Sequence, residues 1–104
     1  MNGFYTTDSE GISHLAPTSQ GQRELLEQLM QDPGAIGDIW LAHTESGWAI
    51  NVFPSGLVQL ERPGKEVREL GPLGLAKVLE LWGWLAKGEL QQIEAQPWRL
   101  GTPR

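Results

Sequence analysis

Histidine, serine and acidic side chains are the residues of this chain that could perform chemistry. His14 and His43 are the only imidazoles, and Asp8 and Glu10 precede the first of them. A metal site needs ligands at a set spacing, such as two histidines four residues apart on one helix. These residues show no such spacing. We therefore predict no metal site and no cofactor.

Nucleophilic catalysis would need a serine or threonine beside a histidine that an acid orients. The five serines and two histidines show no arrangement that singles out such a set. There is no cysteine, which excludes thiolate catalysis and a zinc site built on sulfur. The segment 71–74 lacks the lysine and the serine or threonine of a phosphate-binding loop. We predict no catalytic residues, and the sequence favours a protein that is not an enzyme.

Acidic residues are concentrated in the first 60 residues. This part holds seven acids and one base, whereas residues 61–104 hold six acids and seven bases. The resulting negative field would repel nucleic acid and attract a basic protein. The alternative is a solvated surface that keeps the protein soluble. The candidate protein-binding acids are Glu24, Glu27, Asp38 and Glu45.

The elements that would position these residues follow from the hydrophobic period. Apolar residues alternate over 39–42 and 48–53, short turns follow each run, and 57–61 makes a third strand. Short turns between strands give antiparallel neighbours. We predict an α+β fold with an antiparallel meander of three to four strands. Three of them lie within 36–62, and the fourth is an edge strand at 66–70.

Two helices are predicted beside this sheet. Leu25, Leu26, Leu29 and Met30 form one apolar stripe, which predicts a short N-terminal helix over 19–31, capped by Ser19. A second, longer stripe predicts the helix that covers the sheet, over 72–87. The segment 89–96 is predicted as a short helical turn or a strand. The C-terminal segment is expected to lie behind the long helix as a third layer.

Trp84 lies on the far side of the predicted helix 72–87. At about 100° per residue it is roughly 160° from the centre of the apolar stripe. Either the C-terminal segment covers it, or it belongs to an exposed apolar patch that binds a partner. The residues of that candidate patch are Leu73, Leu81 and Trp84.

The predicted sheet also has a face that points away from the helix. Trp40, Asn51 and Phe53 are expected there because they alternate with the core positions. An antiparallel sheet can leave such a face in water, or the face can hold an aromatic pocket for a small molecule. The candidate pocket residues are Trp40, Asn51, Phe53 and His43.

The domain prediction is a flexible arm at 1–18, one domain at 19–100 and a polar tail at 101–104. No run approaches the roughly 20 apolar residues of a membrane span, and the first ten residues do not resemble a signal peptide. We predict a cytoplasmic protein without a membrane partner. The leading hypothesis is a non-enzymatic protein-interaction domain: an adaptor, an inhibitor or an immunity-type protein. The alternatives are a small-molecule-binding or enzymatic domain and a structural subunit.

Overall fold

The computed structural model describes residues 3–32, 34 and 37–101. This part of the chain forms seven strands and three helices. The strands are β1 (Phe4–Thr7), β2 (Ser13–Leu15), β3 (Ile39–His43), β4 (Ala49–Val52), β5 (Val58–Glu61), β6 (Arg68–Leu70) and β7 (Arg99–Leu100). The helices are α1 (Ser19–Gln31), α2 (Leu75–Ala86) and α3 (Leu90–Glu94).

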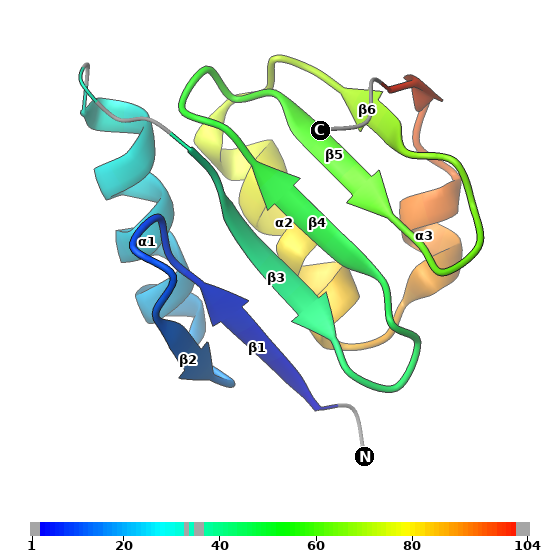
Figure 1. The fold of residues 1–104 in the computed structure, drawn as a ribbon, viewed down its shortest axis with the longest axis horizontal. Helices are drawn as coiled ribbons and strands as arrows, with labels where there is room; N and C mark the ends of the chain where they lie inside the picture. Colours follow the sequence, from blue (N-terminus) through cyan, green and yellow to red (C-terminus); the bar gives the residue numbers. More distant parts are fainter. Residues whose placement is uncertain (1–2, 33, 35–36, 102–104) are drawn as a thin grey trace.

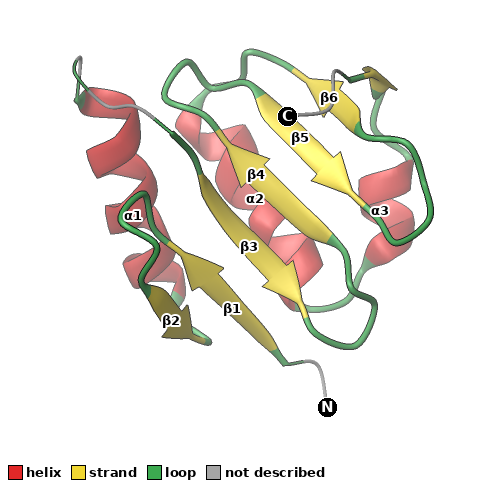
Figure 2. Cartoon of the chain, in the orientation of Figure 1, coloured by secondary structure: helices red, strands yellow, loops and turns green. Residues whose placement is uncertain are grey.

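All seven strands belong to one antiparallel sheet in the order β2-β1-β3-β4-β5-β6-β7. The three helices lie together behind this sheet, and the described residues place no helix on its front face (Figures 1 and 2). Helix α2 contacts β3 and β4, with α1 and α3 on its two flanks. The described residues therefore form two layers, the sheet and the three helices behind it.

The prediction of an α+β fold with an antiparallel sheet is confirmed, but the predicted number of strands is wrong. The sheet has seven strands instead of three or four. The segment predicted as a loose arm, residues 1–18, contributes β1 and β2, and β1 pairs directly with β3. The predicted edge strand at 66–70 is β6, which is itself covered at its outer edge by β7. Parts of the predicted arm, sheet region and polar tail fall on residues 1–2, 33, 35–36 and 102–104, which lie outside the described residues.

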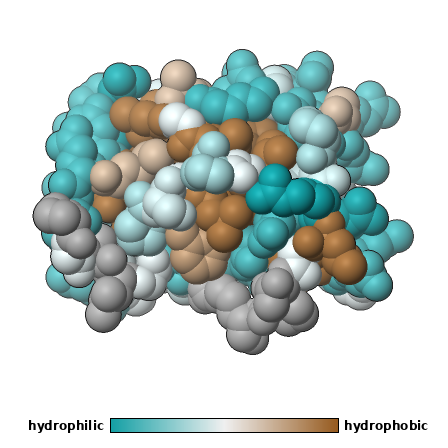
Figure 3. All heavy atoms as spheres, turned by 90° about the horizontal axis from the view of Figure 1, so that it is seen from above, coloured by the Kyte–Doolittle hydropathy of each residue, from teal (hydrophilic) through white to brown (hydrophobic). Residues whose placement is uncertain are grey.

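The core lies between the helices and the inward face of the sheet. Side chains at every second position of the central strands point inward, so Leu41 and Ile50 are directly opposite each other and both are buried. Trp82 of α2 is fully buried against this face and donates its Nε1–H to the backbone oxygen of Ile50 at 3.2 Å. On the face seen from above, hydrophobic atoms are visible among hydrophilic ones, and the flank on the α1 side is hydrophilic (Figure 3).

Helix α2 begins three residues later than the predicted start at 72. The N–H of Leu73 donates to the backbone oxygen of Gly56 at 2.9 Å, which ties the segment before the helix to the turn between β4 and β5. Gly56 has φ +94°, and a Cβ there would clash with the carbonyl of Leu73. This close approach packs Leu73 against the turn, and α2 begins directly after its N-cap residue, Gly74.

The predicted third layer is wrong, because α3 lies beside α2 and not behind it (Figure 1). Ile93 is fully buried, and its backbone oxygen accepts the Nε1–H of Trp98 at 2.6 Å. The segment 89–96 is thus a short helix that extends the helical layer toward β6. None of the described helices has the length and apolarity that a membrane crossing requires.

Candidate functional site

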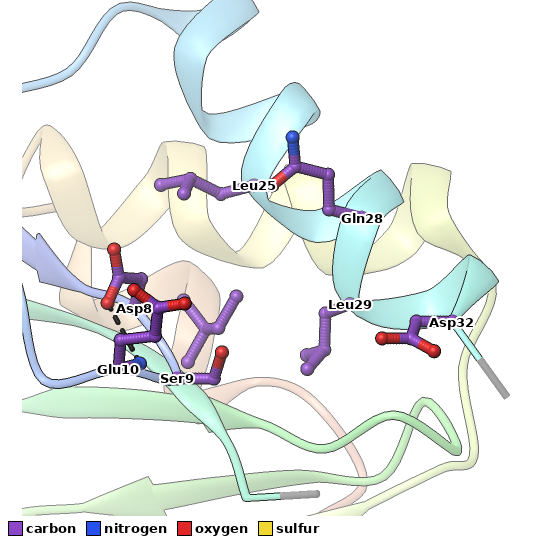
Figure 4. A pocket seen from close by; sticks show the side chains of 8 residues that line it. Asp8, Ser9, Glu10, Leu25, Gln28, Leu29 and Asp32 are labelled. Carbon is purple, nitrogen blue, oxygen red and sulfur yellow. Dashed lines mark hydrogen bonds between the residues drawn. The ribbon is translucent and has the colours of Figure 1, made fainter. Parts of the chain in front are cut away.

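A groove lies between α1 and the hairpin formed by β1 and β2. Its first hollow has a volume of about 280 Å³. The turn residues Asp8, Ser9 and Glu10 face α1 across this hollow, as Figure 4 shows. The lining from α1, its C-terminal end and β3 consists of Leu25, Gln28, Leu29, Asp32 and Ile39.

A second hollow of about 220 Å³ continues the groove along β2. It shares Leu25 and Gln28 with the first hollow, so the two are adjacent. Its other lining residues are His14, Pro17, Gly21 and Glu24. We call the two hollows together the acidic groove.

The acidic groove combines an apolar floor with a negative rim. Leu25, Leu29 and Ile39 supply the floor. Four carboxylates line it, and none of the described lining residues is a lysine or arginine. The four acids are Asp8, Glu10, Glu24 and Asp32. Such a surface suits a ligand that carries both positive charge and apolar groups.

Asp8 shapes the hairpin turn that forms one wall. Its Oδ1 accepts the backbone N–H groups of Glu10 and Ile12, each at 3.0 Å. Its Oδ2 lies 3.1 Å from Nε2 of His14 on the returning strand. Aspartate favours such turns because its side chain can hydrogen-bond to backbone two residues onward. The turn therefore holds two of the groove acids, Asp8 and Glu10, on the side that faces α1.

Helix α1 forms the other wall because its two faces differ. Gln22, Leu26 and Leu29 are buried toward the core. Residues 21, 24, 25 and 28 line the groove, at the three- and four-residue spacing of one helical face. The helix cap is Thr18, whose Oγ1 accepts the N–H of Gly21 at 3.1 Å, and not Ser19 as predicted. The cap fixes where the helix starts beside β2.

The pKa of Asp8 is lowered from its ordinary value of 3.8. The largest cause is the hydrogen bond with His14, followed by the one from the N–H of Ile12. A carboxyl group whose pKa is lower in the folded protein adds stability above its unfolded pKa. That contribution is lost as the pH falls through the folded value. The contribution of Asp8 is thus present at neutral pH and is lost progressively as the pH falls below about 4.

Asp8→Ala is expected to lower the free energy of unfolding by about 1–2 kcal/mol, because two backbone N–H groups lose their acceptor. Asp8→Asn keeps an oxygen that can accept from those groups, so it should lower the free energy of unfolding less than Asp8→Ala does. Chemical denaturation at several pH values measures both effects. Between about pH 4 and pH 2, the unaltered protein should lose more stability than Asp8→Asn. Parallel losses in this range would show that the Asp8 carboxylate does not support the turn.

The predicted protein-binding acids are not brought together. Glu24 lines the acidic groove. Glu27 pairs with Arg23 one turn away along α1, at 2.8 Å. Asp38 is buried just before β3, and Glu45 is exposed in the turn between β3 and β4. Of these four, only Glu24 belongs to the groove lining.

The predicted apolar patch does not form one exposed surface. Leu81 is fully buried in the core. Leu73 and Trp84 are half-buried against that core, and Nζ of Lys77 lies 5.1 Å from the centre of the Trp84 ring. The long stem of lysine can cover an aromatic face in this way.

The predicted pocket residues lie on both faces of the sheet. Trp40 and Asn51 are directly opposite each other on the face without helices, and Phe53 lies just beyond the end of β4. His43 lies on the helix side, is buried, and accepts the N–H of Ser46 at its Nδ1. Asn51 is only 3% exposed, and its Nδ2 donates to Glu61 at 2.6 Å. The pocket stays a prediction, and His43 is separated from it by the sheet.

Sequence reasoning counted Asp8, Glu10 and Asp32 in the acidic half but did not select them. Their convergence depends on β1 pairing with β3, which are more than 30 residues apart in the chain. The one available signal was Asp8 followed by a glycine three residues later, which is typical of a tight turn.

No group of three or more histidine, cysteine or acidic side chains among the described residues is arranged to hold a metal ion. No family model, no curated protein and no solved structure matches this chain.

Proposed function

We propose that this domain is a non-enzymatic protein-interaction module that binds a basic partner through the acidic groove. The observation that carries the proposal is the convergence of four acids on an apolar floor, with no lysine or arginine in the part of the lining that the structure describes. These acids are Asp8, Glu10, Glu24 and Asp32. Opposite charge increases the rate of association and orients the partner, and apolar contact adds affinity. A cytoplasmic location belongs to the proposal, since a chain without cysteine fits a reducing compartment.

A binding titration with a defined probe tests this proposal. The probe is a fluorescent hexapeptide in which lysine and valine alternate, and the control replaces each lysine with glutamate. We expect only the lysine peptide to bind, with an association rate that falls markedly as salt rises from about 0.05 to 0.5 M. Equal binding of the two peptides, or binding that ignores salt, would contradict a role for the groove charges.

A second candidate is the binding of a small molecule on the sheet face without helices. The observation that favours it is the Oδ1 atom of Asn51, which is buried and lacks a hydrogen-bond partner beside the half-buried Trp40. Buried acceptors are normally paired, so this atom marks a place where a ligand or a water could bind after a small side-chain movement. Protection of Trp40 fluorescence from quenching by a ligand would support this candidate.

A further inference from the structure

Strand β2 forms an open edge of the sheet. Among the described residues it has a neighbour on one side only, which is β1. Its side chains are exposed throughout, and Leu15 is 87% exposed. Ile12, just before the strand, is 53% exposed. An edge with exposed apolar side chains is a template for another strand.

The hydrogen-bond pattern shows which backbone groups point to this edge. Ala16 donates its N–H to Phe4 at 3.1 Å, and Asp8 donates to Ile12 at 2.9 Å. In an antiparallel ladder, hydrogen-bonded residue pairs alternate with pairs that are not hydrogen-bonded to each other. Phe4–Ala16 and Asp8–Ile12 are hydrogen-bonded pairs, so Thr6–His14, midway between them, is the next one. The N–H and C=O groups of Ser13 and Leu15 therefore point away from β1, toward the open edge.

The acidic groove runs alongside the same edge. The second hollow is lined by His14 of β2 on one side and by Glu24, Leu25 and Gln28 of α1 on the other. The side chain of His14 is on the helix side of the sheet, since Thr6, its direct partner, is opposite the buried Leu41. A strand placed next to β2 would thus present every second side chain to the helix side, where α1 and the acidic groove lie.

From these features we infer that the ligand is an extended basic segment that adds to the sheet as a strand next to β2. The inference rests on the proposed function and specifies its partner. In an added strand, successive side chains point to opposite faces. Those on the helix side would enter the groove near Glu24 and Asp8. Those on the other side would lie beside Leu15.

Charge and polarity on the two sides define the chemistry of the segment. On the helix side, the groove offers carboxylates and favours lysine or arginine. On the other side, the exposed Leu15 and the half-buried Tyr5 opposite it favour an apolar residue. The expected ligand alternates basic and apolar residues, and its backbone supplies hydrogen bonds to Ser13 and Leu15.

Leu15→Pro tests the backbone pairing, with Leu15→Ala as the matched control. Both remove the leucine side chain, but only proline removes the N–H that points to the open edge. The bonds to β1 remain, and proline is tolerated at edge strands when its nitrogen faces solvent. We expect the lysine and valine hexapeptide to bind Leu15→Pro about tenfold more weakly than Leu15→Ala.

A second measurement does not depend on how the variant folds. The same hexapeptide, N-methylated at alternate residues on the edge that would pair with β2, keeps its charges but cannot complete the ladder. We expect it to bind the unaltered protein at least tenfold more weakly. A peptide of the same composition with three lysines followed by three valines should also bind more weakly, because it cannot separate the two residue types between the two faces.

The outcomes separate the two proposals. If the N-methylated peptide binds as well as the parent and Leu15→Pro binds as Leu15→Ala does, strand addition is wrong. The proposed function would still stand in that case if glutamate peptides failed to bind. If no lysine peptide binds the unaltered protein, both proposals are overturned.

Discussion

Replacing Trp82 with alanine is expected to lower the free energy of unfolding by about 3–5 kcal/mol. Trp82 is fully buried at the centre of the helical layer, and its indole N–H is bonded to Ile50 of β4. Removing the ring leaves a cavity where α2 meets the sheet, and small domains have only about 5–15 kcal/mol of stability in total. Chemical denaturation with a linear extrapolation measures the change.

Trp84→Ala is the matched control for this prediction. The same residue type is removed from the same helix, two positions later, but Trp84 is only half-buried. Trp82→Phe adds a second comparison, since it keeps most of the apolar volume and loses the hydrogen bond. We expect Trp82→Ala to lower the free energy of unfolding most. Trp82→Phe should lower it less, and Trp84→Ala should lower it much less than Trp82→Ala. A Trp84→Ala variant as unstable as Trp82→Ala would place the centre of the core elsewhere.

Reversing two charges of the acidic groove is expected to weaken binding of the lysine and valine hexapeptide roughly thirtyfold. Glu10 and Glu24 lie on opposite walls of the groove, and both are exposed. Each exposed pair contributes about 0.5 kcal/mol, and a reversal replaces this attraction by a repulsion of similar size, so that each site costs about 1 kcal/mol of binding free energy. Two sites together therefore cost about 2 kcal/mol. Isothermal titration calorimetry on the Glu10→Lys/Glu24→Lys variant measures this loss.

The control variant carries the same change in net charge at other places. Glu45 lies in the turn between β3 and β4, and Glu66 lies in the connection between β5 and β6, away from α1 in Figure 1. Both are exposed. We expect Glu45→Lys/Glu66→Lys to retain binding within about threefold at 0.15 M salt, where charges more than about 8 Å apart are screened. Equal losses in the two variants would mean that the overall charge, and not the groove, attracts the peptide.

Helix α1 was predicted with its observed bounds because several local signals agree there. An apolar stripe from Leu25 to Met30 and a turn after Asp32 set its length. Only the cap residue was misplaced by one position. The central strands were predicted for the same reason, since alternation in 48–53 is strong and the turns between strands are short.

Strands β1 and β2 could not be predicted because their sequences lack that alternation of apolar and polar residues. Strand β1 reads Phe-Tyr-Thr-Thr, and its inward side chains are Phe4 and Thr6, a weak hydrophobic signal. Strand β2 is three residues long and exposed throughout. Strand β1 is held in place by pairing with the distant residues of β3, and β2 is held by pairing with β1. No local pattern reveals the pairing of β1 with β3.

The acidic groove could not be predicted for the same physical reason, because it depends on pairing between distant strands. The charge map identified the acidic half of the chain, but the acids that converge come from a turn, a helix and the end of that helix. Only the sheet order β2-β1-β3 brings the turn opposite α1. Glu24 was selected from the helix alone, whereas Asp8 and Glu10 required the position of the hairpin.

Binding in the acidic groove is tested most directly by titrating the lysine and valine hexapeptide into isotope-labelled protein and following the amide chemical shifts. If the peptide binds as a strand beside β2 with its lysines in the acidic groove, the largest chemical-shift changes should occur at residues 8–15 of the hairpin and at 21–28 of α1. Residues 45–47 and the sheet face around Trp40 and Asn51 should change little. Shifts centred on Trp40 and Asn51, with the hairpin and α1 unaffected, would contradict binding in the groove and favour the sheet-face candidate.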